Sequence, residues 1–268
     1  MSETPAGTPA DDFDGGWDNR VSLVGGWVHR TPRFPDREAQ LRREAELLPW
    51  LAPRLPLPIP VLEVVGEDPF TVRHAYLPGG PCPGTSARQG AALGAFLRTL
   101  HDVDPDEAVR HGALDPASAH RDTAETLDRM TRHVLPLLPH DLVPSGTALL
   151  ERLSAPPADP RLAHGDLGPE HIRVVGEEVA GIIDWGDCRL CDPAIDLAWT
   201  AFGTAPAFTD ALLAAYDADD ALLSRGRDLH LLGPWHEVLY GQGDGGPAFV
   251  ESGLAGVVSR LVGPGRAG

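Results

Sequence analysis

The stretch that decides the fold reads HGDLGPEHIRVVGEEVAGIID at residues 164–184. Two short apolar runs, residues 172–175 and 179–183, flank a turn-like centre, which is the pattern of a β-hairpin. With Glu177 and Glu178 as the turn, His171 pairs with Asp184 at the open end of the hairpin. Directly paired residues have Cα atoms about 4.5–5.5 Å apart. The hairpin therefore predicts that a possible metal ligand and a carboxylate lie side by side.

A second carboxylate is expected at the same end of the hairpin. Asp166 precedes His171 by five residues, in a loop rich in Gly and Pro. One carboxylate can orient a substrate hydroxyl and accept its proton, and another can hold Mg²⁺ against nucleotide phosphates. Phosphoryl transfer requires little more than this positioning and charge neutralisation. The segment therefore predicts a phosphoryl-transfer site.

The composition narrows the function classes. The 268 residues carry a net charge of −17, which argues against a nucleic-acid partner because phosphate binding needs a basic face. An acidic surface suits a cationic partner, or serves solubility alone. All 22 basic residues are Arg, so a Walker-type phosphate loop and a Schiff-base lysine are excluded.

Cysteine usage and hydropathy indicate a cytoplasmic protein. The three cysteines are few and odd in number, and the N-terminus does not read as a signal peptide. No apolar run approaches the roughly 18 residues of a membrane span, so no membrane partner is expected. Cys188 and Cys191 lack a second pair, which argues against a zinc site. We expect a monomer or a weak dimer.

The order of patterns along the chain predicts an α+β protein with two lobes. Residues 1–12 read as a flexible tail, and residues 13–77 as a small β-rich N-terminal lobe that contains a helix at 36–51. The breaker Pro78-Gly79-Gly80-Pro81 marks the lobe boundary. Residues 78–268 read as a larger, mostly helical lobe. Its predicted helices span residues 86–102, 119–138, 143–153, 194–202, 206–217, 228–240 and 247–262.

The central motifs resemble those of the aminoglycoside phosphotransferase family, antibiotic kinases with a bilobal protein-kinase-like fold. The matching segments are His164-Gly165-Asp166-Leu167, Ile183-Asp184 and Asp192-Pro193-Ala194-Ile195-Asp196-Leu197-Ala198. Weaker similarity extends into the N-terminal lobe, at residues 16–19, 28–33 and 42–44. Together these segments cover most of residues 15–80 and 164–200.

This resemblance implies roles in the C-terminal lobe. Asp166 would be the catalytic base, and Asp184 the principal Mg²⁺ ligand. His171 stands where most of the family has an Asn that binds a second Mg²⁺, so it is either a metal ligand or a supporting group. His164 is expected to hold the loop, and Asp192 and Asp196 to orient it by hydrogen bonds.

The resemblance also implies a nucleotide site in the N-terminal lobe, with ATP or GTP as phosphate donor. Arg30 occupies the place of the family's strand-three Lys, and Glu44 that of its ion-pair partner. Taken alone, this pair could be a surface ion pair of little consequence. The backbone near Tyr76 and Leu77 would form the hinge that binds the base.

The acceptor is predicted less sharply. A hydroxylated, cationic antibiotic is expected, an aminoglycoside first. Since some macrolide phosphotransferases resemble this chain at His171 and Arg30, a macrolide is the alternative, and a small metabolite the third option. Four late residues could line the acceptor cleft, although the plainer interpretation of each one alone is surface or core: Asp187, Trp235, Glu237 and Tyr240.

Two hypotheses of other classes remain at this point. His171 and Arg30 depart from the usual family pattern, so the chain could bind nucleotide or antibiotic without turnover. The Asp and His cluster could also belong to a hydrolase, which would act without a nucleotide.

Overall fold

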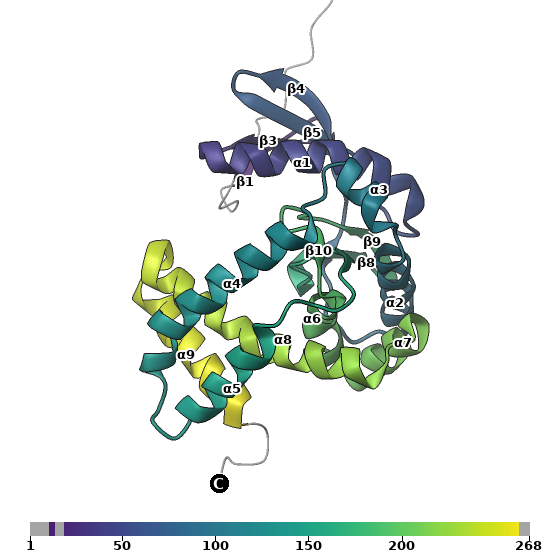
Figure 1. Cartoon of the computed structure of the whole chain (residues 1–268). Coiled ribbons are helices and arrows are strands. Elements are labelled where there is room, and N and C mark those ends of the chain that lie inside the picture. The colour runs from purple at the N-terminus through teal and green to yellow at the C-terminus, as the bar shows by residue number, and fades with distance from the viewer. Residues whose placement is uncertain (1–10, 14–18, 263–268) are drawn as a thin grey trace, which may run out of the picture.

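The computed structural model describes residues 11–13 and 19–262. Its N-terminal part is a five-stranded antiparallel sheet in the order β1-β2-β3-β5-β4 (Figure 1). The strands are β1 Asp11–Phe13, β2 Asn19–Val24, β3 Trp27–Pro32, β4 Glu63–Glu67 and β5 Phe70–Ala75. The expected tail at residues 1–12 thus overlaps strand β1, while residues 1–10 lie outside the described residues.

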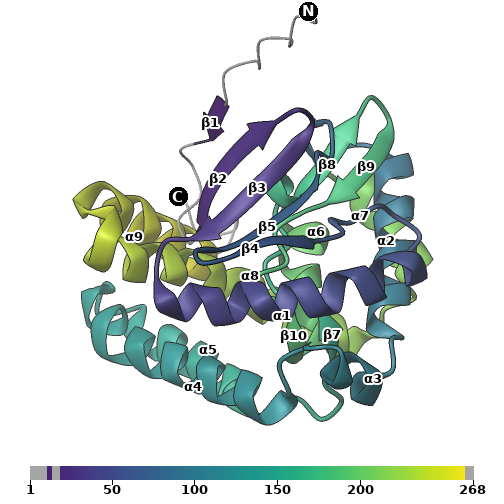
Figure 2. The ribbon, with the colours of Figure 1, turned by 90° about the horizontal axis from the view of Figure 1, so that it is seen from above.

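Helix α1, Pro35–Leu51, lies along one face of this sheet (Figures 1 and 2). The helix forms where the apolar spacing predicted it, because Leu41 and Leu48 fall on one face and are almost fully buried. They pack in the same core cluster as Phe70 and Val72 of β5. This packing holds the helix against the sheet and so fixes where the polar side chains of the helix lie.

The C-terminal part contains two small sheets and is otherwise mostly helical. Strands β6 Gly80–Pro81, β8 Ile172–Val175 and β9 Glu178–Ile182 form one sheet, and β7 Arg161–Ala163 pairs with β10 Arg189–Cys191. The helices are α2 Ala87–His101, α3 Pro105–Arg110, α4 Pro116–His133, α5 Val143–Leu153, α6 Leu197–Phe202, α7 Pro206–Tyr216, α8 Asp220–Tyr240 and α9 Pro247–Val262. Most predicted helices are confirmed within a few residues. Helix α8, however, starts well before residue 228, and α3 was not expected.

Helices α2 and α7 approach each other closely. A side chain at Gly90 would bring its Cβ to 2.2 Å from the carbonyl oxygen of Phe208, and one at Gly94 would come within 2.3 Å of the Leu212 carbonyl oxygen. The two glycines lie one turn apart on α2, so only their missing side chains permit this contact.

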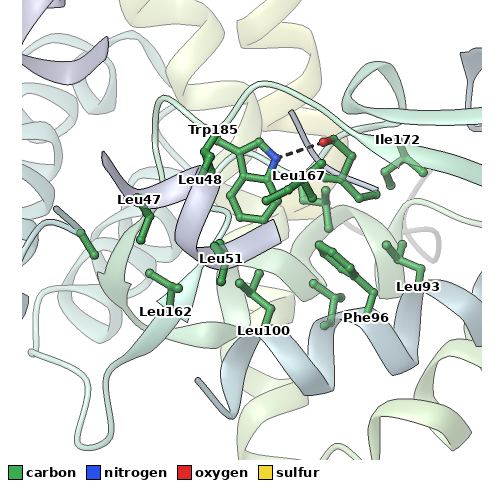
Figure 3. Packing of buried hydrophobic residues seen from close by; sticks show 14 of the residues in the cluster. Leu47, Leu48, Leu51, Leu93, Phe96, Leu100, Leu162, Leu167, Ile172 and Trp185 are labelled. Carbon is green, nitrogen blue, oxygen red and sulfur yellow. Dashed lines mark hydrogen bonds between the residues drawn. The ribbon is translucent and has the colours of Figure 1, made fainter. Parts of the chain in front are cut away.

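The buried residues form two separate core clusters. The larger one joins the α1 leucines, α2, the small sheets and α7, with Trp185 near its centre (Figure 3). The smaller one lies among α4, α5, α8 and α9 and is built around Met130, Leu149, Trp235 and Val257. The C-terminal part therefore consists of a main body and a helical bundle with a core of its own. None of the described helices is long and apolar enough to cross a membrane.

The predicted β-hairpin is present, but the predicted register is wrong. Val175 pairs with Glu178, so the turn falls on Gly176 and Glu177, and Gly176 adopts the left-handed conformation with φ of 58°. A bulge then shifts the ladder, and Ile183 N donates to His171 O at 2.9 Å. His171 therefore pairs with Ile183, and Asp184 lies one residue beyond. A glycine takes the positive φ of such a turn more readily than a glutamate does. The turn therefore lies one residue earlier than predicted.

We predict that Phe96→Ala lowers the free energy of unfolding by about 3–5 kcal/mol, because Phe96 is fully buried and packs against Trp185 with ring centroids 6.2 Å apart. Phe34→Ala is the matched control. Phe34 is 58% exposed, so its loss should change stability by less than about 0.5 kcal/mol. Urea denaturation measures both, and equal effects would contradict the position of this core.

Candidate functional site

The loop that carries Asp166 is held from beneath by one buried carboxylate. Asp196 is fully buried, and its two oxygens accept the backbone N–H of His164 at 2.8 Å and of Gly165 at 2.9 Å. Burial by itself raises the pKa of a carboxyl. Hydrogen bonds from His101 and from the Gly165 N–H outweigh it, so the pKa of Asp196 lies below its usual range. Asp196 therefore fixes the backbone immediately before Asp166.

The next member of this network, His101, was not predicted from the sequence. His101, at the end of α2, is nearly fully buried, and its Nε2 lies 3.1 Å from Asp196 Oδ2 while its Nδ1 lies 2.7 Å from the Tyr216 hydroxyl. The tyrosine hydroxyl can donate to Nδ1, which leaves Nε2–H to donate to the carboxylate. The available signal was a polar residue that directly follows Leu100 on the buried face of the helix.

His164 joins the two halves of the site. Its ring is fully buried, Nδ1 accepts the backbone N–H of Asp166 at 3.3 Å, and Nε2 donates to the Ile183 carbonyl oxygen at 3.0 Å. Since a backbone N–H can only donate, Nδ1 carries no proton and the ring is neutral. Burial lowers the pKa of His164 in agreement with this tautomer. The ring thus ties Asp166 to the residue that precedes Asp184.

His171 lies between the two carboxylates. Its Nδ1–H donates to the Asp166 carbonyl oxygen at 2.6 Å and lies 3.6 Å from Asp166 Oδ2, while Nε2 lies 3.5 Å from Asp184 Oδ2. Because Nδ1 donates to a carbonyl, the neutral ring has its lone pair on Nε2, toward Asp184. The His171 side chain is 14% exposed, whereas those of Asp166 and Asp184 are 61% and 56% exposed. The three side chains are brought together, and their roles stay predictions.

Two further properties set the acidic groups apart. The pKa of Asp166 is raised, first because neighbouring groups partly displace water from its otherwise exposed carboxylate and then by the nearby carboxylate of Asp187, while His171 opposes the shift. Asp184 has a φ of 65°, a left-handed conformation that is uncommon for a residue with a side chain. Such conformations often occur at functional sites. It turns the chain just after the ladder ends, and in this conformation the carboxylate meets His171 despite the shifted register.

Arg30 and Glu44 form a two-point ion pair across the N-terminal part. Arg30 Nη1 donates to Glu44 Oε2 at 2.6 Å, and Nη2 donates to Oε1 at 3.1 Å. The two side chains are 12% and 5% exposed, which excludes the alternative of a loose surface pair. Burial raises the pKa of Glu44, and Arg30 opposes that shift. A Cβ at Gly186 would lie 3.6 Å from Glu44 Oε1, so the pair lies next to the turn that carries Asp184.

The predicted hinge lies where β5 ends. The Tyr76 backbone N–H donates to the Gly26 carbonyl oxygen at 2.9 Å, and its side chain is exposed. Leu77 lies against β9, because a Cβ at Gly181 would come within 2.9 Å of its Cδ1. Base binding by this segment stays a prediction. Residues 16–18, part of the segment 16–19 that is similar to the family, lie outside the described residues.

A cavity of about 1200 Å³ opens beside the loop of Asp166, between the main body and the helical bundle. Asp166 and Asp187 line it, together with one face of α4 and one face of α8. The α8 face consists of Leu222, Arg225, Leu229, Leu232, Gly233 and His236. The walls carry eight aspartates and five arginines, so acidic side chains are in excess over basic ones in the lining.

Three of the four residues predicted to line the acceptor cleft lie elsewhere. Trp235 is fully buried in the smaller core, so its prediction is wrong. Glu237 acts electrostatically on Arg260 of α9, and the Tyr240 ring meets Phe249 edge-on with centroids 5.0 Å apart. None of the three lines the cavity, and only Trp235 belongs to the core of the bundle. Asp187 does line the cavity.

Asp192 lies at the start of the short helix Pro193–Asp196 and supports it. Its Oδ1 accepts the Ala194 N–H at 3.0 Å, and its Oδ2 accepts from Arg225 Nε at 2.7 Å. This caps the turn that delivers Asp196 and joins it to α8.

The described site offers few candidate metal ligands. Across residues 11–13 and 19–262, no group of three or more His, Cys, Asp or Glu side chains is arranged to hold a metal ion. Asp184 and His171 provide two possible ligands. This number agrees with Mg²⁺ chemistry, because the ion commonly keeps several waters and shares one or two carboxylates with substrate phosphates.

Comparison with known proteins gives a consistent result. The family model described as the phosphotransferase enzyme family matches residues 11–230. The uncharacterized protein YcbJ of Bacillus subtilis (strain 168) is 29% identical over 215 residues, which are 71% of this chain and 67% of that protein.

Solved structures share the fold. The GDP and kanamycin complex of APH(2")-IIIa superimposes with a TM-score of 0.82 at 22% identity, covering 96% of this chain and 94% of the other. The macrolide 2'-phosphotransferase MphH of Brachybacterium faecium has a TM-score of 0.73 at 25% identity, covering 92% and 91%. The streptomycin and ATP complex of APH(2")-IIa has a TM-score of 0.67 at 18% identity, covering 96% and 97%. The predicted resemblance and the predicted protein-kinase-like α+β fold are confirmed.

We predict that Asp196→Asn lowers the free energy of unfolding by roughly 2 kcal/mol at pH 7, because an amide cannot accept both backbone N–H groups as well as a carboxylate does. The folded pKa of Asp196 is depressed, so its stabilisation is present above the unfolded value of about 3.9 and is lost as the pH falls below it. Stability of the wild type should therefore fall more steeply below about pH 4 than that of the variant. Urea denaturation across pH measures this, with exposed Asp141→Asn as control.

A second prediction separates packing from function in the Arg30–Glu44 pair. Glu44→Ala removes the carboxylate that accepts two N–H groups of a buried guanidinium and should cost about 3–5 kcal/mol. The double variant Arg30→Met, Glu44→Leu should recover much of this stability, since apolar pairs often replace buried ion pairs without loss. Its affinity for Mg²⁺-nucleotide should nevertheless stay low. Denaturation and nucleotide titration give the two readouts, and recovery of nucleotide affinity would contradict a phosphate role for Arg30.

Proposed function

The chain belongs to the phosphotransferase enzyme family, and we propose that it moves the γ-phosphate of a purine nucleoside triphosphate to a hydroxyl of a small-molecule antibiotic. The observation that carries this proposal is the convergence of Asp166, His171 and Asp184 at the edge of a large cavity. Phosphoryl transfer depends mainly on positioning and charge stabilisation, which such a cluster can supply.

Asp166 is proposed as the catalytic base. Its carboxylate is exposed to the cavity, while its backbone is restrained on three sides by His164, His171 and, through Gly165, Asp196. A restrained carboxylate can hold the acceptor hydroxyl in line with the phosphate and take its proton as the new bond forms. The raised pKa of Asp166 makes its carboxylate a stronger proton acceptor than an ordinary aspartate.

Asp184 and His171 are proposed as the protein ligands for Mg²⁺. When bound, Mg²⁺ would neutralise charge on the nucleotide phosphates. Asp184 offers the oxygen ligand that this hard cation prefers, and His171 offers the lone pair of Nε2, which already lies 3.5 Å from Asp184 Oδ2. The Nδ1 hydrogen bond to Asp166 fixes the direction of that lone pair.

Arg30 is proposed to steady the phosphates. Unlike Lys, Arg is always charged and has N–H groups beyond those it uses to pair with one carboxylate. Glu44 takes two of them, at 2.6 and 3.1 Å, and so fixes the plane of the guanidinium beside the turn of Asp184. ATP and GTP are both candidate donors, since the solved relatives include complexes with GDP and with ATP.

An aminoglycoside remains the expected acceptor, and one observation favours a macrolide as the second candidate. The cavity walls mix five arginines with eight aspartates, and several of these are paired with each other, for example Arg225 with Asp192. Five of the eight aspartates take part in no described ion pair with an arginine, which suits a polycation. The apolar part of the α8 face, with Leu222, Leu229 and Leu232, suits a bulky acceptor with few charges. Relatives that act on either class share the fold. A metabolite kinase and the predicted monomeric or weakly dimeric state stay predictions.

We predict that Asp166→Ala lowers kcat roughly 10²–10⁴-fold while leaving Mg²⁺-nucleotide affinity within about threefold, because the base is lost and the nucleotide contacts remain. Mass spectrometry of aminoglycosides and macrolides incubated with ATP or GTP would detect a single added phosphate. Asp141→Ala, an exposed substitution outside the site, is the control and should retain full activity.

The same experiment discriminates the other hypotheses. Binding of nucleotide and antibiotic without a phosphorylated product that depends on Asp166 would support a binding protein. Cleavage of a substrate without nucleotide would support a hydrolase. Either result would contradict the proposed function.

A further inference from the structure

Helix α8 has a proline in its interior, within the part that lines the cavity. Pro234 is buried, and it has no N–H that could donate to the carbonyl of His230, four residues earlier. A proline at such a position commonly kinks or breaks a helix. In this structure α8 nevertheless continues to Tyr240. The carbonyl of His230 therefore needs a donor from outside the backbone ladder of its own helix.

Arg260 of α9 supplies that donor. Its Nη1 donates to the His230 carbonyl oxygen. The guanidinium also lies close to Gly233, because a Cβ at this position would come within 2.9 Å of Nη1. A glycine destabilises a helix interior, and here its missing side chain leaves the space that Arg260 occupies. A side chain of α9 thus replaces the hydrogen bond that Pro234 removes from α8.

The contact of Arg260 continues a row of close approaches between α9 and α8. A Cβ at Gly253 would lie 3.0 Å from the Pro234 carbonyl oxygen, and one at Gly256 would lie 3.0 Å from Pro234 Cβ. Arg260 follows about one turn after Gly256, on the same side of α9. The backbone of α9 therefore packs directly around the proline. The family match ends at residue 230, so this part of α8 and all of α9 lie beyond it.

The residues around this hydrogen bond form part of the cavity wall. Gly233 and His236 line the cavity together with Asp166 and Asp187. The pKa of His236 is lowered, first because neighbouring groups displace water from its ring and then by the charge of Arg189, while Asp187 opposes the shift. His236 is therefore within electrostatic reach of the turn that follows Asp184. The direction of α8 after its proline decides where this wall stands.

We propose that Arg260 is a positioning residue for the acceptor. By donating to the His230 carbonyl it keeps α8 helical past Pro234 and holds the cavity wall at His236 in place. Arg260 itself is not among the described residues that line the cavity. The inference rests on the proposed phosphotransfer function. Since the groups proposed to bind phosphate lie on other elements, loss of this contact should weaken acceptor binding and leave the chemical step unchanged.

A double-mutant cycle on acceptor kinetics tests this role. Arg260→Met removes the donor and should raise the acceptor KM about five- to tenfold, with kcat and the nucleotide KM within about twofold. Pro234→Ala gives the His230 carbonyl a backbone N–H. In that background Arg260→Met should change the acceptor KM by less than about twofold. Arg132→Met is the matched control, because Arg132 is an exposed α4 residue that pairs with Asp128, and it should leave all constants unchanged.

Hydrogen exchange followed by mass spectrometry monitors the helix without an acceptor. The backbone N–H groups of residues 235–240 should exchange about tenfold faster in Arg260→Met than in wild type, because the helix is no longer held across Pro234. The double variant should exchange like Pro234→Ala alone. Equal acceleration in both backgrounds would show that Arg260 acts through general packing, and would overturn the inference.

The outcomes separate this inference from the function on which it rests. An unchanged acceptor KM in folded Arg260→Met would overturn the inference, and so would an equal rise with and without Pro234→Ala. If Arg260→Met does not fold, the double variant should fold, and failure of both to fold would overturn the inference. If no antibiotic gains a phosphate from either nucleotide, the proposed function fails. Hydrogen exchange then still decides whether Arg260 holds α8 across Pro234.

Discussion

The whole site depends on one buried negative charge. The Asp196 carboxylate is removed from water and accepts hydrogen bonds from two successive backbone N–H groups and from His101. A buried charge is tolerated only when it is fully paired. Because its partners come from α2 and from the segment 164–165, the requirement to pair it draws together elements that are far apart in the sequence. The position of Asp166 follows from this requirement.

The C-terminal motif could be interpreted from the sequence because its residues are close together along the chain. Between Gly165 and Asp196 the local pattern contains a hairpin, a turn rich in glycine and a short capped helix, and all of these form. The register error at Glu177 changed little, since the left-handed backbone of Asp184 still delivers its carboxylate to His171. The local sequence pattern was therefore enough to predict how the loop of Asp166 and the following hairpin fold.

Residues that act over long distances could not be predicted in the same way. His101 reaches Asp196 across 95 positions, and no local pattern reveals that contact. The prediction of which α8 residues line the cavity was wrong at Trp235, which packs into the bundle core. The wall is formed instead by residues such as Leu232, Gly233 and His236. Aromatic residues favour burial, and an amphipathic pattern alone does not say which of two neighbouring bodies a helix face will meet.

The division of buried residues into two clusters has a consequence for how such a protein can diverge. The residues proposed to bind phosphate lie on elements anchored in the larger cluster, whereas much of the wall opposite Asp166 is built on α4 and α8, helices that are also anchored in the smaller one. Substitutions on these walls change the shape offered to an acceptor without disturbing the geometry of the reacting groups. Related proteins can thus keep the same residues for the proposed phosphoryl transfer while the acceptors that they bind differ.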